Sequence, residues 1–181
     1  MRKNVKWLGA ILLLLLVLSG CGGGPKSDVT VFVMPENGIV SDLTERLQQT
    51  LQSRLGESPT VTVNGSVIFS MEKLVVEIAA GGNGVLILPE DQLKAVLGQG
   101  GAVNLEGLLK KEDYPGGVRE AVISSQQGVE ERQTALFAVP MTESKWFKEA
   151  GYKGNPMYAF IPANAPDMDK AKQVMAAIAE K

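Results

Sequence analysis

Apolar and polar positions change period several times along the chain, and these changes predict alternating strands and helices. Short apolar runs have the length of strands, and they fall at 29–34, 60–63, 84–88, 135–139 and 157–161. Between them apolar residues recur at helical spacing, over 41–55, 70–80, 89–97, 144–150 and 167–178. This alternation predicts an α/β domain with a mainly parallel sheet flanked by helices on both faces.

The second predicted helix has a clear start, stripe and end. Ser70 is a good N-terminal cap, and Gly81-Gly82 is a typical helix stop. Spacings of three and four residues give this helix one apolar stripe, made of Met71, Leu74, Val75 and Ile78.

The segments around this helix differ in how strongly they indicate structure. Val85 to Leu88 is apolar throughout, which is typical of a central strand covered on both faces. Ser41 is expected to cap the helix over 41–55. Lys110 to Thr134 is polar and turn-rich, and it predicts an outlying hairpin.

The start of the chain has the pattern of a targeting signal. Arg2, Lys3 and Lys6 precede an uncharged apolar run over 8–18, and small residues follow that run. A basic start, a short apolar middle and small residues at the exit are the three parts of a secretory signal peptide. The run is shorter than the roughly 20 apolar residues that a membrane-spanning helix requires. We therefore predict that residues 1–20 are a signal peptide.

The end of this segment, Leu18-Ser19-Gly20-Cys21, resembles the lipobox of bacterial lipoproteins. The resemblance implies that Cys21 receives a diacylglyceryl group with palmitate or similar acyl chains, and that the chain is cut just before it. The alternative is an ordinary secreted protein with a free cysteine near its cut site. Residues 21–28 would be the lipidated cysteine and a flexible tether that reaches about 15 Å. Residues 29–181 would form a single α/β domain.

Composition argues against several classes of function. The chain has 18 Lys and Arg, 20 Asp and Glu, and no His, so cleavage before Cys21 leaves 15 basic and 20 acidic residues and a net charge of −5. An acidic domain is a poor binder of polyanions, and no nucleic-acid partner is expected. The absence of His and of a free thiol removes the usual general base and metal ligands. We expect no cofactor, no metal site and no catalytic residue, so the protein is not expected to be an enzyme.

Four local motifs have a structural explanation beside a functional one. Ser70-Met71-Glu72-Lys73 matches the Ser-x-x-Lys motif of penicillin-recognising enzymes, although a helix cap explains Ser70. Gly81 to Gly84 follows a helix and opens a strand, which is the reverse of a phosphate loop. The acidic pairs at Glu130-Glu131 and Asp167–Asp169 are typical of solvated faces and caps. Trp146 is either a core anchor or a ligand platform.

Longer stretches of the chain resemble bacterial extracellular solute-binding lipoproteins. Lys73 to Gly81, followed by Gly84 to Leu88, is similar to a helix–strand unit of that family. Ala138 to Met141 resembles its Gly-Val-Pro strand end, and Trp146 to Gly151 resembles its Trp-Phe-x-x-Ala-Gly helix. Tyr158 to Ile161 resembles its late strand, and Ala171 to Ala179 its closing helix. Members of the family have two lobes that close on a ligand. Because this chain has room for about one lobe, the resemblance implies a single-lobe, solute-binding-protein-like domain.

Polar loops follow three of the predicted strands, where ligands of open parallel sheets normally bind. The candidate ligand-binding residues in these loops are Glu36, Asn37, Asp91, Thr142 and Glu143. No residue is assigned to a metal or to catalysis, and Cys21 is the lipidation site.

Together these patterns predict a lipoprotein on the extracytoplasmic face of the cell membrane, held by the lipid on Cys21. Its non-catalytic domain would bind a small-molecule ligand or a membrane-protein partner, as an accessory to transport. The alternative hypothesis is a structural or assembly lipoprotein that docks onto another envelope protein. A large exposed apolar patch away from the strand ends would favour that alternative. A hydrolase that uses Ser70 or a carboxylate pair is the third hypothesis.

Overall fold

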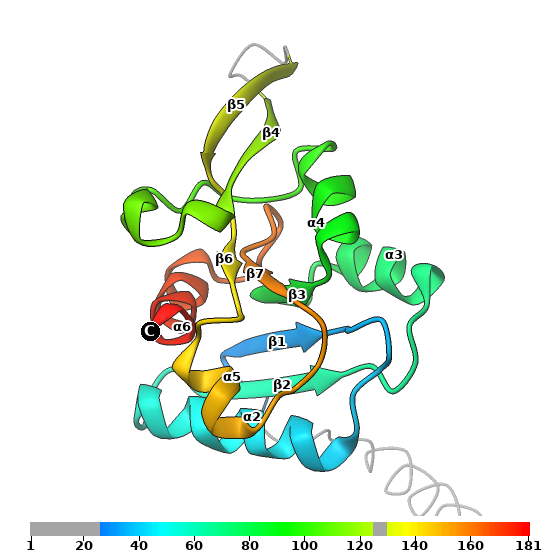
Figure 1. Ribbon diagram of the computed structural model, residues 1–181, viewed down its shortest axis with the longest axis vertical. Helices are drawn as coiled ribbons and strands as arrows, with labels where there is room; N and C mark the ends of the chain where they lie inside the picture. The colour runs from blue at the N-terminus through cyan, green and yellow to red at the C-terminus, as the bar shows by residue number, and fades with distance from the viewer. Residues whose placement is uncertain (1–25, 125–129) are drawn as a thin grey trace, which may run out of the picture.

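The computed structural model describes residues 26–124 and 130–181 (Figure 1). The predicted signal peptide and Cys21 lie outside the described residues. The described chain forms an α/β fold in which a five-stranded mixed sheet packs against helices, and a two-stranded hairpin projects from one end (Figure 1). The elements in chain order are β1 (Val29–Val33), α2 (Ser41–Leu55), β2 (Val61–Gly65), α3 (Met71–Ala80), β3 (Val85–Leu88), α4 (Glu90–Leu97), two 3-10 turns (Lys111–Asp113 and Pro115–Gly117), β4 (Val118–Ser124), β5 (Glu130–Leu136), β6 (Val139–Pro140), α5 (Lys145–Ala150), β7 (Tyr158–Phe160) and α6 (Met168–Ala179).

The main sheet has the strand order β2-β1-β3-β7-β6. β1 pairs parallel with β2 and β3, whereas β7 pairs antiparallel with β3 and β6. The predicted α/β class is confirmed, but the sheet is mixed because half of its pairings are antiparallel. The connection from β6 through α5 returns to the edge at which β6 ended, where the N–H of Met141 donates to the carbonyl of Met157.

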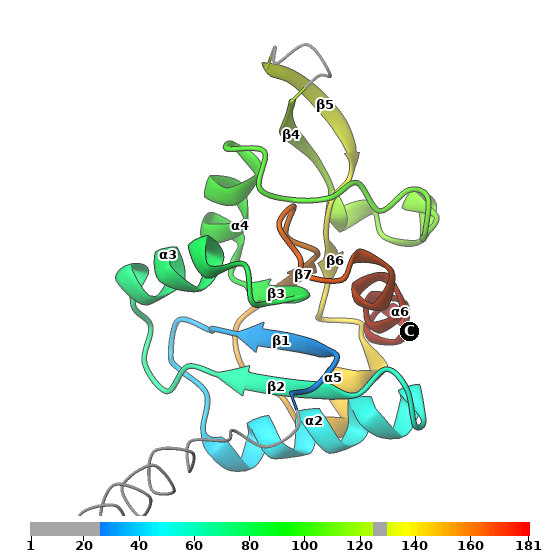
Figure 2. The ribbon, with the colours of Figure 1, turned by 180° about the vertical axis from the view of Figure 1, so that it is seen from behind.

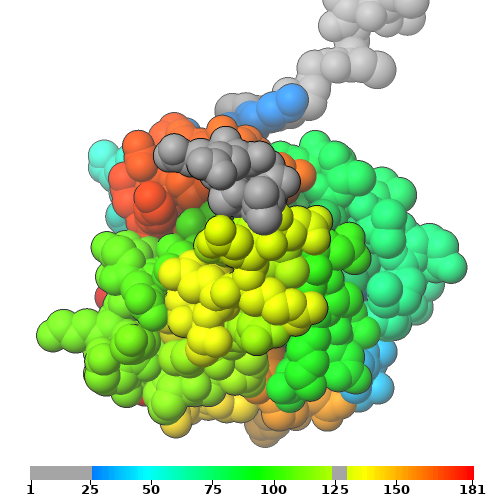
Figure 3. Space-filling model, turned by 90° about the horizontal axis from the view of Figure 1, so that it is seen from above, coloured from blue at the N-terminus to red at the C-terminus, as the bar shows by residue number. Residues whose placement is uncertain are grey.

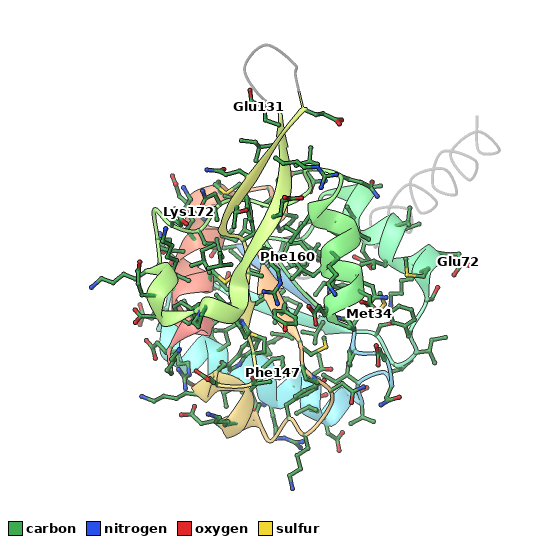
Figure 4. The ribbon with its side chains drawn as sticks, turned by 45° about the horizontal axis from the view of Figure 1, so that its top comes forward. Met34, Glu72, Glu131, Phe147, Phe160 and Lys172 are labelled. Atoms are coloured by element: carbon green, nitrogen blue, oxygen red, sulfur yellow. The ribbon has the colours of Figure 1, made fainter. Side chains whose placement is uncertain are left out.

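Side chains alternate between the two faces of the sheet, and helices cover both faces. Val31 and Ile87 pack on the side of α2, α5 and α6, whereas Phe32 and Phe160 pack on the side of α3 and α4. Figures 1 and 2 show α3 and α4 next to each other on one side of the molecule, away from α6. Figure 4 shows Met34 and Phe160 inside the molecule. The helix layers on both faces therefore agree with the sequence prediction.

Several local predictions are confirmed, and one cap is corrected. β3 is the middle strand of the sheet, and all four of its residues are buried. The hairpin expected within 110–134 is present as β4 and β5, which pair antiparallel from Val118–Leu136 to Ser124–Glu130. Ser70 caps α3 and accepts a hydrogen bond from a backbone N–H three residues on, at 3.2 Å. The helix over 41–55 forms, but its N-terminal cap is Val40, without a side-chain hydrogen bond.

The prediction of one strand over 135–139 is wrong, because the chain divides there between two sheets. Residues up to Leu136 complete β5 in the hairpin, and Val139 begins β6 in the main sheet. Between them the N–H groups of Phe137 and Ala138 both donate to the carbonyl of Gly117, which holds this segment against the residue before β4. Figure 3 shows the hairpin on the upper surface of the molecule, with α4 beside it.

The outer edge of the sheet at β2 is closed by two glutamine side chains from α2. Gln52 Oε1 accepts a hydrogen bond from the N–H of Val61 at 2.8 Å, and Gln48 Oε1 accepts one from Val63 at 3.0 Å. An edge strand with free N–H groups can pair with another chain. These two bonds therefore protect this edge from strand addition.

Asp28 fastens the start of the described chain to the domain. Its carboxylate accepts hydrogen bonds from the backbone N–H and the hydroxyl of Thr60, each at 2.8 Å, and from Lys170 Nζ at 2.6 Å. The bonds from Lys170 and Thr60 hold the pKa of Asp28 below its ordinary value of 3.8. Asp28 therefore joins β1 to the start of β2 and to α6.

Replacing Asp28 with asparagine is expected to lower the free energy of unfolding at pH 7, measured as a fall in the urea midpoint. Because the pKa of Asp28 is depressed in the folded state, its contribution is present above pH 3.8 and is lost as the pH falls below that value. The midpoints of wild type and Asp28→Asn should therefore approach each other in acid. Asp91→Asn, at an exposed position on α4, is the matched control and should keep the wild-type midpoint at pH 7. A gap that stays undiminished down to pH 2 would contradict this role of Asp28.

Candidate functional site

The three loops that carry the predicted ligand-binding residues lie at one end of the sheet. β1 pairs parallel with β3, and β7 pairs antiparallel with both β3 and β6, so β1, β3 and β6 run in the same direction. Glu36 and Asn37 follow β1, Asp91 follows β3 in the first turn of α4, and Thr142 and Glu143 follow β6. The loops share an edge, but their side chains lie in different surroundings.

Glu36 and Thr142 lie near one small hollow. Asn155 Nδ2 donates a hydrogen bond to the Glu36 carboxylate at 2.9 Å, and Asn155 and Thr142 line a hollow of about 170 Å³. Burial raises the pKa of Tyr152 in this hollow, and the Glu36 carboxylate raises it further. Asn37 is exposed in the turn beside Glu36. The hollow is smaller than the roughly 300 Å³ at which ligand pockets usually begin.

Glu143 and Asp91 have partners elsewhere. Glu143 forms an ion pair of 2.9 Å with Lys181, and the hydrogen bond from Lys181 lowers the pKa of Glu143. Asp91 lies 3.7 Å from Lys94 in the next turn of α4, and its side chain is 85% exposed. The predicted residues therefore do not converge on one pocket within the described residues.

Several large apolar side chains are exposed on the outward side of α3, which is unusual for a helix at a protein surface. Five large apolar side chains are exposed on α3 and the loop before it, and we call them the α3 surface: Val67 (66%), Ile68 (68%), Met71 (45%), Val75 (60%) and Val76 (65%). Figure 4 shows Glu72, at the N-terminal end of α3, pointing outward. Glu72 and Lys73 are also exposed on α3, so charged and apolar side chains share this side of the helix. Large exposed apolar side chains that gather on one face can mark an interaction site.

A groove runs between α3 and α4 beside this surface, with a volume of about 400 Å³. We call it the α3–α4 groove, and its lining residues are Met71, Leu74, Val75, Ile78, Ala79, Gln92, Ala95, Val96, Gln99, Gly101, Ala163 and Asn164. None of these residues is charged, although charged residues make up 21% of the chain. The volume lies within the range of small-molecule sites, which are mostly apolar with a few polar groups.

Amide side chains supply the polar groups of the groove. Gln92 carries a buried Oε1 that has no hydrogen-bond partner among the described residues. Asn164 Nδ2 donates to the carbonyl of Ile78 at 2.8 Å, which ties the loop after β7 to the last turn of α3. A buried acceptor without a partner costs free energy unless a bound group donates to it. Gln92 Oε1 exposes almost no surface, so a ligand lying in the groove does not reach it without a movement of the Gln92 side chain.

The Ser-x-x-Lys motif lies at the start of α3, where its two side chains have separate partners. Ser70 Oγ accepts from the backbone N–H of Lys73 and donates to the Glu72 carboxylate at 2.9 Å. Lys73 Nζ lies 5.6 Å from the ring centre of Phe32. These contacts place Ser70 as a helix cap and Lys73 over an aromatic ring.

The sequence pattern did not predict the α3 surface, because it gave this helix a single buried stripe. Leu74 is buried and Ile78 is partly buried, yet Met71 and Val75 of the same stripe are exposed. The signal that could have revealed the surface is Val76, an apolar residue outside the stripe.

Comparison with protein-family models, with curated proteins and with solved structures finds no match to this chain. Among residues 26–124 and 130–181, no helix is both long and apolar enough to cross a membrane. In the same two ranges, no three Cys, Asp or Glu side chains come together as a metal site would require. An inference about function therefore rests on the geometry of the groove and on the lipobox-like segment at Cys21.

Proposed function

We propose that the protein is a cell-envelope lipoprotein, anchored on the extracytoplasmic face through acylated Cys21, whose domain binds an uncharged apolar ligand without chemistry. The α3–α4 groove is the binding site. The observation that carries this proposal is an open groove of about 400 Å³ whose lining holds no charge. The lipobox-like segment before Cys21 supports the anchor.

The α3–α4 groove supports ligand binding better than the predicted residues at the carboxyl edge of the sheet do. At that edge Glu36, Asp91 and Glu143 are already paired with other side chains, and the hollow near Thr142 has less than half the volume of the groove. We propose further that the domain is similar to one lobe of solute-binding proteins. The helices on both faces of its open sheet support this similarity. A single lobe has no second lobe to close over the ligand, so the ligand would lie between α3 and α4.

A second candidate function is assembly with another envelope protein. It is favoured by Val67, Ile68 and Val76, which are exposed but do not line the groove. Apolar residues exposed around a pocket suit a protein partner that covers the whole α3 surface.

A ligand screen on the acylated mature protein in phosphatidylcholine nanodiscs tests the proposed function. Neutral apolar compounds are expected to raise the melting temperature, whereas sugars, amino acids and charged oligopeptides are not. A ligand at a hundredfold excess over its Kd adds about 2.7 kcal/mol to the free energy of unfolding. For a chain of this size that corresponds to a rise of about 5–10 °C.

Glu36→Ala is the matched control, because Glu36 belongs to the carboxyl edge and not to the groove. This variant should show the same ligand-induced rise as wild type. If polar solutes raise the melting temperature and Glu36→Ala abolishes that rise, the carboxyl edge is the binding site and the proposed site is wrong. The absence of any rise with neutral apolar compounds would also contradict the proposal.

A further inference from the structure

The α3 surface and the place where the chain enters the domain indicate a second contact with the membrane. We infer that the α3 surface lies on the bilayer that holds the anchor, with the side chains of Val67, Ile68 and Val76 in shallow contact with its acyl chains. None of these three side chains lines the α3–α4 groove. The contact depends on the proposed function, because acylated Cys21 is what holds the domain at the membrane, and it adds a surface that lies outside the groove.

The chain enters the domain beside the end of α3. Lys26, the first described residue, lines a hollow together with Gly82, which lies two residues after the helix ends. The five-residue step from Cys21 to Lys26 spans at most about 17 Å when fully extended. The anchor therefore keeps the bilayer close to this end of α3.

The α3 surface lies within the same reach. At 1.5 Å per residue, Val76 is about 6 Å from Ala80 along the helix axis, and Met71 is about 14 Å from it. Both distances are shorter than the extended step from Cys21 to the domain. A bilayer that holds the acyl chains can therefore also contact the α3 surface.

The second half of α3, from Val75 to Ala80, exposes only valine and alanine side chains. Glu77 is the charged residue of this half of the helix, and it is half-buried. Its carboxylate accepts a hydrogen bond from Asn83 Nδ2 at 3.0 Å. An ionised group that leaves water without a partner is costly, so a half-helix without an exposed charge suits contact with acyl chains.

Glu72 and Lys73, in the first turn of α3, limit the depth of the contact. Both are exposed, and Ser70 Oγ donates to the Glu72 carboxylate at 2.9 Å. Helices that lie in the membrane interface bury their apolar side by about 5–10 Å and keep charged groups among the lipid head groups. One acidic and one basic residue leave this turn without net charge. The contact is therefore shallow and does not depend on the charge of the lipid.

The composition of the α3 surface suits a bilayer better than a protein partner. Its five residues are three Val, one Ile and one Met, and they include neither an aromatic residue nor an arginine. Trp, Tyr and Arg contribute most of the binding energy between proteins, whereas Val is under-represented among such residues. The hydrophobic effect is not directional, so contact with acyl chains needs no matching shape.

A quenching experiment in phosphatidylcholine vesicles that carry the acylated mature protein tests this inference. Val76→Cys and Gln49→Cys each receive one environment-sensitive fluorophore, since acylated Cys21 does not react. Gln49 is the matched reference, because it is exposed on α2, which packs on the other face of the sheet from α3. Lipids with brominated acyl chains are expected to quench the label at residue 76 several-fold more strongly than the label at residue 49.

A charge substitution makes the test independent of a label at residue 76. With the fluorophore on Ile68→Cys, the additional substitution Val76→Glu should reduce quenching several-fold, because a carboxylate must leave the acyl chains for water. Gln49→Glu adds the same charge on α2 and should leave the quenching unchanged. Because the contact is apolar, high salt should leave it unchanged as well.

Equal quenching at residues 76 and 49 would overturn the inference, and so would quenching that disappears at high salt. A photocrosslinking group at residue 76 is expected to join lipid in native membranes. A covalent link from this group to another protein would overturn the inference in favour of a protein partner.

Separate measurements report on the proposed function. The mass of the purified protein reports the acylation of Cys21. Val76→Glu should keep the ligand-induced rise in melting temperature, because Val76 does not line the groove. If acylation and that rise are both present but quenching is equal at residues 76 and 49, the bilayer contact is wrong and the proposed function stands. A protein without the acyl group would contradict the proposed function and the bilayer contact together.

Discussion

Cys21→Ser is expected to abolish acylation of the protein and its stable attachment to the membrane. The sulfur of Cys21 is the predicted attachment point for the diacylglyceryl group, and the chain has no other cysteine that could replace it. Each buried methylene group contributes about 0.8 kcal/mol, so two or three acyl chains anchor the protein stably where one chain would not. Incorporation of labelled palmitate should fall to background in Cys21→Ser, and cleavage before residue 21 should stop.

Ser19→Ala is the control for this prediction, because it keeps a small residue in front of the cysteine. It should incorporate palmitate as wild type does and yield the same mature mass. Palmitate incorporation that persists in Cys21→Ser would contradict the anchor, and so would a wild-type protein that keeps its first twenty residues.

Trp146→Ala is expected to lower the free energy of unfolding by about 3–5 kcal/mol, the usual cost of removing a buried aromatic side chain. Trp146 is fully buried in α5, and its ring packs 5.2 Å from the ring of Phe147. Its Nε1 donates a hydrogen bond to the carbonyl of Leu47 at 2.8 Å, which joins α5 to α2. The loss should appear as a lower urea midpoint at an unchanged slope.

Trp146→Phe separates packing from the hydrogen bond. It keeps most of the apolar volume, so it should cost only about 1–2 kcal/mol, mainly from the lost bond to Leu47. If Trp146 were a ligand platform instead of a core anchor, both variants would leave the urea midpoint unchanged. Equal midpoints for wild type and Trp146→Ala would therefore contradict its place in the core.

Local features of the fold were predictable because short stretches of sequence determine them. The buried strand Val85–Leu88 follows from four successive apolar residues, and α3 follows from the Ser70 cap and the Gly81 stop. The directions of the later strands depend on where the chain returns. β7 pairs antiparallel with β3, and no local pattern around Tyr158–Phe160 indicates that direction.

The candidate site was harder to predict than the fold, because exposure is a property of packing. Glu36 and Thr142 reach the expected edge of the sheet, but their surroundings depend on Asn155. Asn155 is far from Glu36 in sequence, and α5 separates it from Thr142. Val75 has the spacing of a buried residue, yet no element covers it. The α3–α4 groove also depends on the loop at Asn164, which comes about ninety residues after α3 begins.

The most direct test of the central claim, that the α3–α4 groove is occupied in the working protein, is the accessibility of a single thiol in native membranes. Cys21 is the only cysteine of the chain and is expected to be acylated, so an introduced cysteine reacts alone. Ala79→Cys reports on the groove, and Gln49→Cys on the exposed side of α2 serves as the reference. If the groove is occupied, a water-soluble maleimide should modify Ala79→Cys several-fold more slowly than Gln49→Cys in membranes. The two rates should become equal once the bound apolar ligand is removed. Equal rates in native membranes would contradict the claim.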